Sequence, residues 1–166
     1  MEESVALRSY FQAHKQEMID TLAAWVAVPS VRGDARPGMP YGAEPARMLK
    51  LALEQCAALG FQTESVADCM GSVELNDLPA ALAVLCHLDV VPAGEGWSQD
   101  PFVLTHRQDT DRLYGRGAID NKGPAVAALY AMRAIRELHI PMKHGVRLLL
   151  GTDEENGSSD LTAYLQ

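Results

Sequence analysis

A histidine and an aspartate stand two positions apart, directly behind an apolar run. The stretch "AVLCHLDVV" places His87 and Asp89 after a run that begins at Ala80. In a strand, residues i and i+2 point to the same face, so both side chains can meet while Cys86 points away. A carboxylate in that place can accept the second ring N–H of a metal-bound imidazole. The alternative is a structural histidine capped by an aspartate, and the H-x-D pattern alone does not separate the two.

A second candidate is Asp120 in the segment "YGRGAIDNKGP". Two glycines permit a tight backbone path here, and Pro124 suits the first turn of a helix that would begin just after Asp120. The alternative is that Asp120 or Asn121 only caps this helix. On that reading Lys122 is a surface charge and Arg116 anchors the loop.

A third candidate is the acidic group in "LLLGTDEENG", where Asp153, Glu154 and Glu155 follow an apolar strand. Mutual repulsion disfavours three adjacent carboxylates unless a cation or solvent offsets it. Because adjacent side chains diverge, one carboxylate can bind a metal while its neighbour transfers protons. The alternative is an exposed acidic turn.

The three candidates are spaced at regular intervals along the chain. His87 and Asp120 are 33 residues apart, and Asp120 and Glu154 are 34 residues apart. Each interval is about one strand–helix unit, so neighbouring strand ends can bring the residues together, as in other open α/β sheets. Histidine with several carboxylates suits zinc, cobalt or manganese in a hydrolytic site. Two metals that share a carboxylate would hold one bridging water. No GxSxG elbow, P-loop or dinucleotide glycine pattern supports another chemistry.

Composition narrows the class of protein. The 166 residues are 48% hydrophobic and carry a net charge of −8, with no basic run, which argues against nucleic acid and anionic membranes as partners. The N-terminal residues have no apolar segment of a secretion signal. Three cysteines without a CxxC pair favour reduced thiols and a cytoplasmic location. Oligomeric state is left open.

The pattern of helices and strands predicts the scaffold. Apolar residues at three-to-four spacing indicate helices over about 4–28, 43–59 and 124–138, with Gly60 as a cap. Strands are expected over 61–67, 80–85 and 146–150, with short strands between 95 and 123 and a further helix from about 158. The run at 80–85 is typical of a central strand covered on both faces. We therefore predict one α/β domain over 1–166, with a mixed, mostly parallel sheet flanked by helices.

At this point a family resemblance is clear. The segments "CHLDVVPAGEGWSQDPF", "LYGRGAIDNKGP" and "GTDEENGSSD" resemble the dinuclear zinc metallopeptidase family of aminoacylase, carboxypeptidase G, acetylornithine deacetylase, carnosinase and the bacterial dipeptidase V. The "DNKGP" form is more similar to the dipeptidase V and carnosinase branch, since the deacylases more often read "DMKG". The resemblance implies a zinc-dependent exopeptidase-like catalytic domain.

The resemblance also implies residue roles. His87 would bind one zinc, Glu155 the other, and Asp120 both, through a cis peptide bond to Asn121. Asp89 would orient His87, and Glu154 would be the general base that activates the bridging water. Gly123 and Pro124 would shape the helix entry behind the metals.

The family pattern extends beyond this sequence. The family has a further carboxylate some twenty residues after the glutamate pair, a distant histidine and a lid domain, and none of these positions is present by Gln166. We therefore expect an N-terminal part of the catalytic domain, incomplete at its C-terminal end and inactive alone. The expected activity of the complete enzyme is hydrolysis of small peptide substrates by a zinc-dependent dipeptidase, with cobalt or manganese as other metals. The alternatives are an N-acyl amino-acid deacylase of the same family and a non-catalytic metal-binding or interaction fragment.

Overall fold

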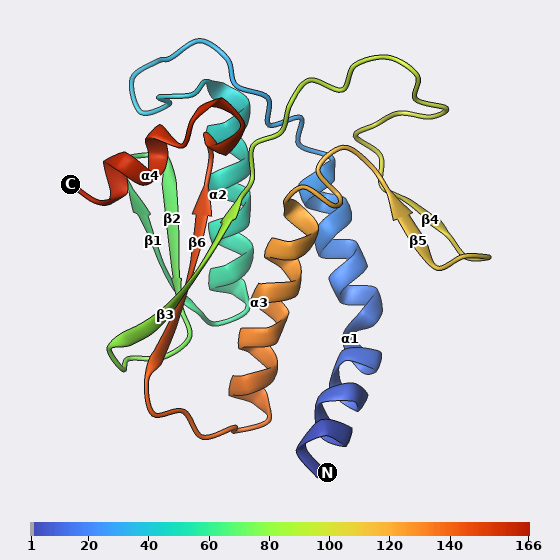
Figure 1. The fold of residues 1–166 in the computed structure, drawn as a ribbon, viewed down its shortest axis with the longest axis vertical. Coiled ribbons are helices and arrows are strands. Elements are labelled where there is room, and N and C mark those ends of the chain that lie inside the picture. Colours follow the sequence, from blue (N-terminus) through green and yellow to red (C-terminus); the bar gives the residue numbers. More distant parts are fainter. Residues whose placement is uncertain (1) are drawn as a thin grey trace.

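The computed structural model describes residues 2–166, with side chains from residue 4 onward, and contains a four-stranded mixed sheet. The strand order is β1-β2-β6-β3, and a separate two-stranded hairpin, β4-β5, lies apart from this sheet (Figure 1). The strands of the sheet are β1 (Gln62–Val66), β2 (Met70–Glu74), β3 (Ala80–His87) and β6 (Gly145–Gly151). The hairpin strands are β4 (Thr105–Arg107) and β5 (Arg112–Tyr114).

The sheet has one parallel and two antiparallel pairings among the described strands. β3 runs parallel to β6, whereas β2 runs antiparallel to both β1 and β6. The mixed sheet is confirmed, with fewer parallel pairings than the sequence predicts. The reason is local, because only three residues separate β1 from β2. Such a short connection joins antiparallel neighbours, while parallel strands need a longer crossover.

The helices lie where hydrophobic spacing predicts them. They are α1 (Glu2–Val26), α2 (Ala43–Ala58), α3 (Lys122–Glu137) and the short α4 (Ser159–Tyr164), with a 3₁₀ turn, η1 (Glu154–Asn156), before α4. α2 packs on β1 and β2, α3 packs on β3 and β6, and α1 packs on α3. Gly60 follows α2 with a φ of +85°, a conformation that a glycine adopts without steric cost.

One hydrophobic core joins the helices to the sheet. Its fully buried members include residues of α1 (Trp25), α2 (Met48), α3 (Leu129) and β6 (Leu148 and Leu150). Leu148 and Leu150 are two residues apart in a strand and share a face. This packing fixes the end of β6, and therefore the start of the acidic turn, relative to α3.

The prediction that residues 80–85 form a central strand covered on both faces is wrong. β3 lies at the edge of the sheet, paired with β6 alone among the described strands. Its first residues are exposed, and Leu82 and Leu85 retain 57% and 52% of their accessible surface. The apolar run is a strand, but no element among the 165 residues described buries these two side chains. Its register also shifts between Ala80 and Leu82, where a β-bulge accommodates one extra residue.

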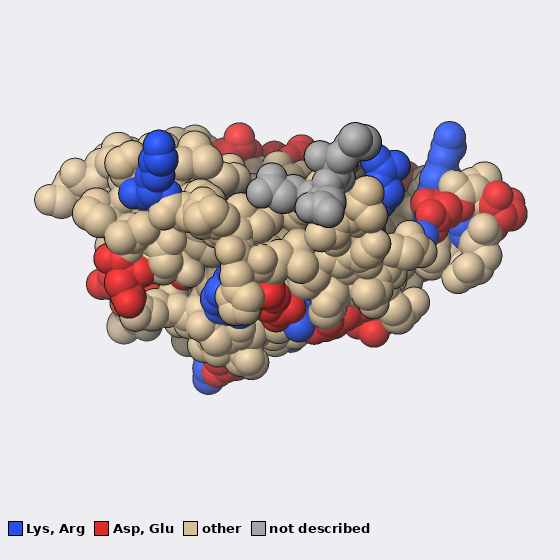
Figure 2. Space-filling view, turned by 90° about the horizontal axis from the view of Figure 1, so that it is seen from below, with Lys and Arg blue, Asp and Glu red and all other residues tan. Residues whose placement is uncertain are grey.

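The surface carries charges of both signs. Seen from below, lysine and arginine side chains alternate with aspartate and glutamate among large uncharged areas (Figure 2). This view shows no continuous basic area on the described part of that face. No helix in the described residues combines the length and apolar character needed to cross a membrane.

Candidate metal centre

The parallel pairing of β3 with β6 brings two of the three candidate segments together. His87, the last residue of β3, is opposite Gly151, the last residue of β6. The ladder continues one step further, since the N–H of Leu88 donates to the carbonyl of Gly151 at 2.8 Å. The segments that follow His87 and Gly151 therefore lie side by side at the carboxyl-terminal ends of β3 and β6. Open α/β folds place their sites at these strand ends.

Asp89 connects these two segments. Its side chain is fully buried, and its carboxylate oxygens accept the backbone N–H groups of Glu154 and Glu155 at 3.2 and 3.1 Å. One of these oxygens also lies 3.4 Å from Nδ1 of His87. Asp89 thus binds the backbone N–H groups of both glutamates, and its carboxylate also faces Nδ1 of His87. This leaves Nε2 of His87 directed toward the remaining candidates.

The metal-binding side chains predicted from the sequence lie close together, around Nε2 of His87. Ligand atoms of His87, Asp120 and Glu155 all lie within 4.8 Å of one another. Nε2 of His87 is 3.0 Å from Oδ1 of Asp120 and 3.7 Å from a carboxylate oxygen of Glu154. His87, Asp120 and Glu154 border a cavity of about 250 Å³ at the strand ends. The peptide bond between Asp120 and Asn121 is cis, as the resemblance implies.

The electrostatics of this group suit a cation. Burial alone would lower the pKa of His87, but hydrogen bonds to Asp89 and Asp120 raise it to about 9. Burial, followed by the nearby Asp120 carboxylate, raises the pKa of Glu155 above its ordinary value. The neighbouring carboxylates contribute to both shifts, and a divalent cation would offset their negative charge. One imidazole and several carboxylates form a donor set that fits zinc, cobalt or manganese.

Two of the alternatives considered for the Asp120 segment are wrong. Asn121 precedes α3, yet no side chain caps the helix with a hydrogen bond. Lys122 is fully buried and not a surface charge. Its ammonium donates to the carbonyls of Trp25 and Val28 at 2.9 and 2.8 Å, which ties the end of α1 to the start of α3. Burial lowers the pKa of Lys122 to about 7.

Arg116 anchors the loop after β3, as one reading of the sequence holds. Its guanidinium donates to the carbonyls of Pro92 and Ala93 at 3.4 and 3.0 Å. The same group lies 5.5 Å from the centre of the Trp97 ring, within the range of a cation–π contact.

The acidic turn is only partly exposed. Glu154 is exposed and Glu155 is half-buried, but Asp153 is fully buried. Asp160, which the sequence analysis did not single out, accepts the N–H groups of Thr152 and Asp153 at 2.6 and 3.0 Å. A Cβ at Gly151 would lie 2.4 Å from this carboxylate, so the strand can end in this way only at a glycine.

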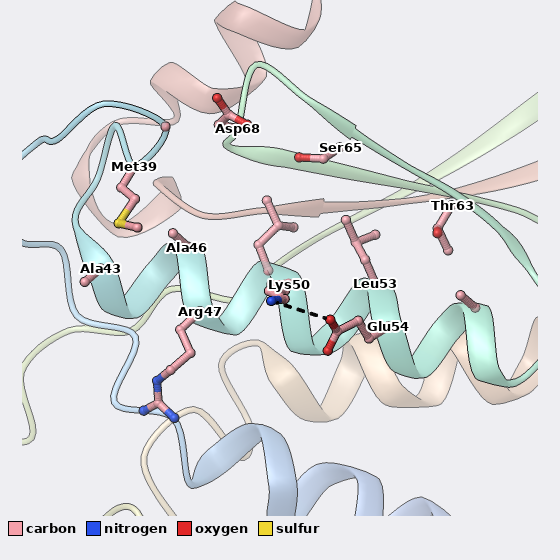
Figure 3. Close-up of a pocket in the computed structure, with 13 residues that line it drawn as sticks. Met39, Ala43, Ala46, Arg47, Lys50, Leu53, Glu54, Thr63, Ser65 and Asp68 are labelled. Carbon is pink, nitrogen blue, oxygen red and sulfur yellow. Dashed lines mark ion pairs between the residues drawn. The ribbon is translucent and has the colours of Figure 1, made fainter.

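Two larger hollows lie away from the metal-binding side chains. A groove of about 620 Å³ runs between α2 and β1, with Leu53 and Ala46 on one side and Thr63 and Ser65 on the other (Figure 3). A groove of about 890 Å³ lies between α1, the start of α3 and the β4-β5 hairpin. Neither groove is lined by His87 or by the glutamate pair.

The chain is similar to a known protein family, to related sequences and to solved structures. The model of the Peptidase family M20/M25/M40 matches residues 83–166, just over half of the chain and all three candidate segments. The chain belongs to this family. M20 peptidases include metallo-carboxypeptidases, so the family implies divalent metal ions. The resemblance seen in the sequence is thus confirmed.

The similar proteins of the M20 family are much longer than this chain. "Putative dipeptidase YtjP" of Bacillus subtilis (strain 168) is 38% identical over 144 residues, which are 86% of this chain and 31% of that protein. "Putative dipeptidase SH1171" of Staphylococcus haemolyticus is 35% identical over 93% of this chain and 33% of its own length. The crystal structure of human carnosine dipeptidase 1 superposes with a TM-score of 0.81 and 30% identity, covering 99% of this chain and 37% of that one. The chain therefore spans about a third of the relatives it matches.

Proposed function

We propose that the complete protein is a metal-dependent dipeptidase and that this chain is the N-terminal part of its catalytic domain. The convergence of His87, Asp120 and Glu155 within 4.8 Å is the observation that carries the proposal. Membership in a peptidase family supports the reaction class, and the names of the similar proteins support dipeptides as substrates. Two zinc ions are the proposed metals, with cobalt or manganese able to replace them.

The proposed roles follow from the contacts of each side chain. His87, Asp120 and Glu155 would hold the metal. Asp89 would orient His87 and fix its tautomer, since its backbone carbonyl and one carboxylate oxygen lie 3.1 and 3.4 Å from Nδ1. A bound divalent cation polarises the scissile carbonyl and lowers the pKa of water. Glu154 would take the proton from the attacking water and deliver it to the leaving amine. Its exposed carboxylate lies beside the metal-binding residues and bears no hydrogen bond to them, which leaves it available for this task.

Metal titration of the 166-residue chain tests the proposed ligands. Calorimetry with Zn²⁺ is expected to show binding to the wild-type chain and a loss of at least about tenfold in affinity in Asp120→Asn. Glu154→Ala is expected to bind within threefold of wild type, because a general base is dispensable for binding. Glu64→Gln, an exposed glutamate on β1, is the matched control. Equal affinity in Asp120→Asn and wild type would exclude the proposed ligand set.

Peptide hydrolysis by the complete protein tests the base and the substrate class. Loss of a general base costs about 10²–10⁴-fold in rate, so Glu154→Ala is expected to lose at least a hundredfold in kcat on dipeptides. Faster turnover of N-acetyl or N-succinyl amino acids than of dipeptides would favour a deacylase of the same family. Metal binding without turnover of either panel would indicate a non-catalytic protein.

A further inference from the structure

The segment between α1 and α2 braces both strand ends that carry the candidate site. Figure 1 shows this blue segment passing beside the red turn after β6. At its start, the hydroxyl of Ser30 donates to the carbonyl of Leu88 at 2.6 Å, and the N–H of Val90 donates back to the carbonyl of Ser30 at 3.1 Å. The segment is therefore fixed to the end of β3, next to His87, before it reaches the acidic turn.

Further along, four side chains form a closed ring between this segment and the acidic turn. Arg32 pairs with one carboxylate oxygen of Asp153, and the hydroxyl of Ser159 donates to the other. The hydroxyls of Ser159 and Tyr41 lie 2.9 Å apart. The ring closes because the Arg32 guanidinium lies 4.8 Å from the centre of the Tyr41 ring, within the range of a cation–π contact.

Asp153 transmits the effect of the ring to the glutamates. It is fully buried and immediately precedes Glu154 and Glu155. Its backbone carbonyl accepts the N–H of Ser158 at 2.8 Å, and its side chain accepts the N–H of Ser159 at 3.2 Å, so both its backbone and its side chain are fixed. Because adjacent side chains diverge, an Asp153 carboxylate held toward the ring leaves its neighbours free to face His87.

We propose that Arg32 and Tyr41 are positioning residues that fix the directions of Glu154 and Glu155 through Asp153. The inference rests on the proposed function, since it assigns these two residues a task in the same metal site. Arg32 neutralises the buried carboxylate, and Tyr41 holds both Arg32 and Ser159. Without them, Asp153 would lose its charge partner and could turn toward the metal ligands. Buried carboxylates are retained only when they are paired and hydrogen-bonded.

Amide hydrogen exchange tests the positioning without any metal. In Arg32→Gln and Tyr41→Phe, the N–H groups of Glu154 and Glu155 are expected to exchange at least tenfold faster, because their bonds to Asp89 form only when the turn is held. Amides in the interior of β6 are expected to stay within twofold of wild type. Arg32→Lys retains the charge and is expected to restore slower exchange than Arg32→Gln.

Arg36→Gln is the matched control, since it removes an arginine of the same segment whose side chain makes no hydrogen bond or ion pair among the described residues. Unchanged exchange at both glutamates in Arg32→Gln and Tyr41→Phe would overturn the proposal. Faster exchange throughout β6 as well would also overturn it, because the two residues would then serve only general stability.

Co²⁺ binding separates this inference from the proposed function. Wild type and Arg36→Gln are expected to bind Co²⁺ with the same visible absorption spectrum. Arg32→Gln is expected to bind about tenfold more weakly with an altered spectrum, at the lower end of the losses that follow removal of groups supporting metal ligands. Absence of Co²⁺ and Zn²⁺ binding in wild type would contradict the proposed function, while the exchange result would still decide the positioning. Normal Co²⁺ affinity and spectrum in Arg32→Gln would overturn the positioning and leave the proposed function standing.

Discussion

Replacing Asp89 by asparagine removes a buried charge while keeping the side-chain shape. Its carboxylate accepts two backbone N–H groups, from Glu154 and Glu155, and faces Nδ1 of His87. An asparagine has one carbonyl oxygen, so one N–H would face the amide nitrogen and lose its acceptor. A hydrogen bond to a charged group contributes about 1.5–3 kcal/mol, and an unsatisfied buried donor costs about 1–3 kcal/mol. We expect Asp89→Asn to lower the free energy of unfolding by about 3–5 kcal/mol.

Urea unfolding followed by circular dichroism measures this loss. For a chain of this size, about 2–4 °C per kcal/mol also predicts a fall in Tm of about 6–20 °C. Asp109→Asn is the matched control, because that carboxylate is exposed and pairs with Arg107 only at 3.3 Å on the surface. It is expected to change stability by less than about 0.5 kcal/mol. An Asp89→Asn chain as stable as the control would refute the view that Asp89 fastens the acidic turn to β3.

Three further changes probe two supports of the site and one buried residue of the core. Gly151→Ala is expected to destabilise by about 1–3 kcal/mol in urea unfolding, because its Cβ would lie 2.4 Å from the Asp160 carboxylate; an unchanged midpoint would show that Asp160 can move away freely. Lys122→Met should cost about 2–5 kcal/mol by the same measurement, since two buried carbonyls lose the donor that contacts them at 2.9 and 2.8 Å; a gain in stability would mean that desolvating the ammonium costs more than its hydrogen bonds contribute. Burial raises the pKa of Cys56 from 9.0 to about 12, so between these pH values the folded state retains a proton that the unfolded state loses. The contribution of this thiol to the free energy of unfolding is complete below pH 9 and is lost as the pH rises to about 12. Cys56→Ala should therefore lose less stability than wild type over that interval, and parallel pH profiles would contradict the prediction.

The elements that could be predicted from the sequence are those whose own residues supply the signal. α2 and α3 carry apolar residues at helical spacing, and Gly60 marks the end of α2. The three candidate segments could be found for the same reason, because each joins a chemically distinctive residue to a strand end or helix entry. Their convergence required the additional assumption that neighbouring strand ends meet; the parallel pairing of β3 with β6 meets it for two of the segments, while Asp120 lies at the entry of α3.

The features that could not be predicted depend on contacts between distant segments. An apolar run such as 80–85 has the same sequence pattern in an edge strand as in a central strand, because its burial depends on the elements that pack beside it. β2 has no signal of its own in the sequence, because its five residues include a glycine and carry no alternating pattern. The burial of Lys122 has no local signal in the sequence, because its acceptors, two carbonyls at the end of α1, lie almost a hundred residues away.

The bulge at the start of β3 has a consequence at the opposite end of the strand. The pairing moves from Ala80 opposite Gly145 to Leu82 opposite Val146, and from there it continues without a shift to His87 opposite Gly151. With no extra residue, His87 would sit one step further along β6, about 3.3 Å away, and its side chain would face the other side of the sheet. The number of residues between the bulge and His87 is therefore part of the information that specifies the ligand set. A single insertion or deletion in that interval would separate the imidazole from the carboxylates while leaving every ligand residue in the sequence.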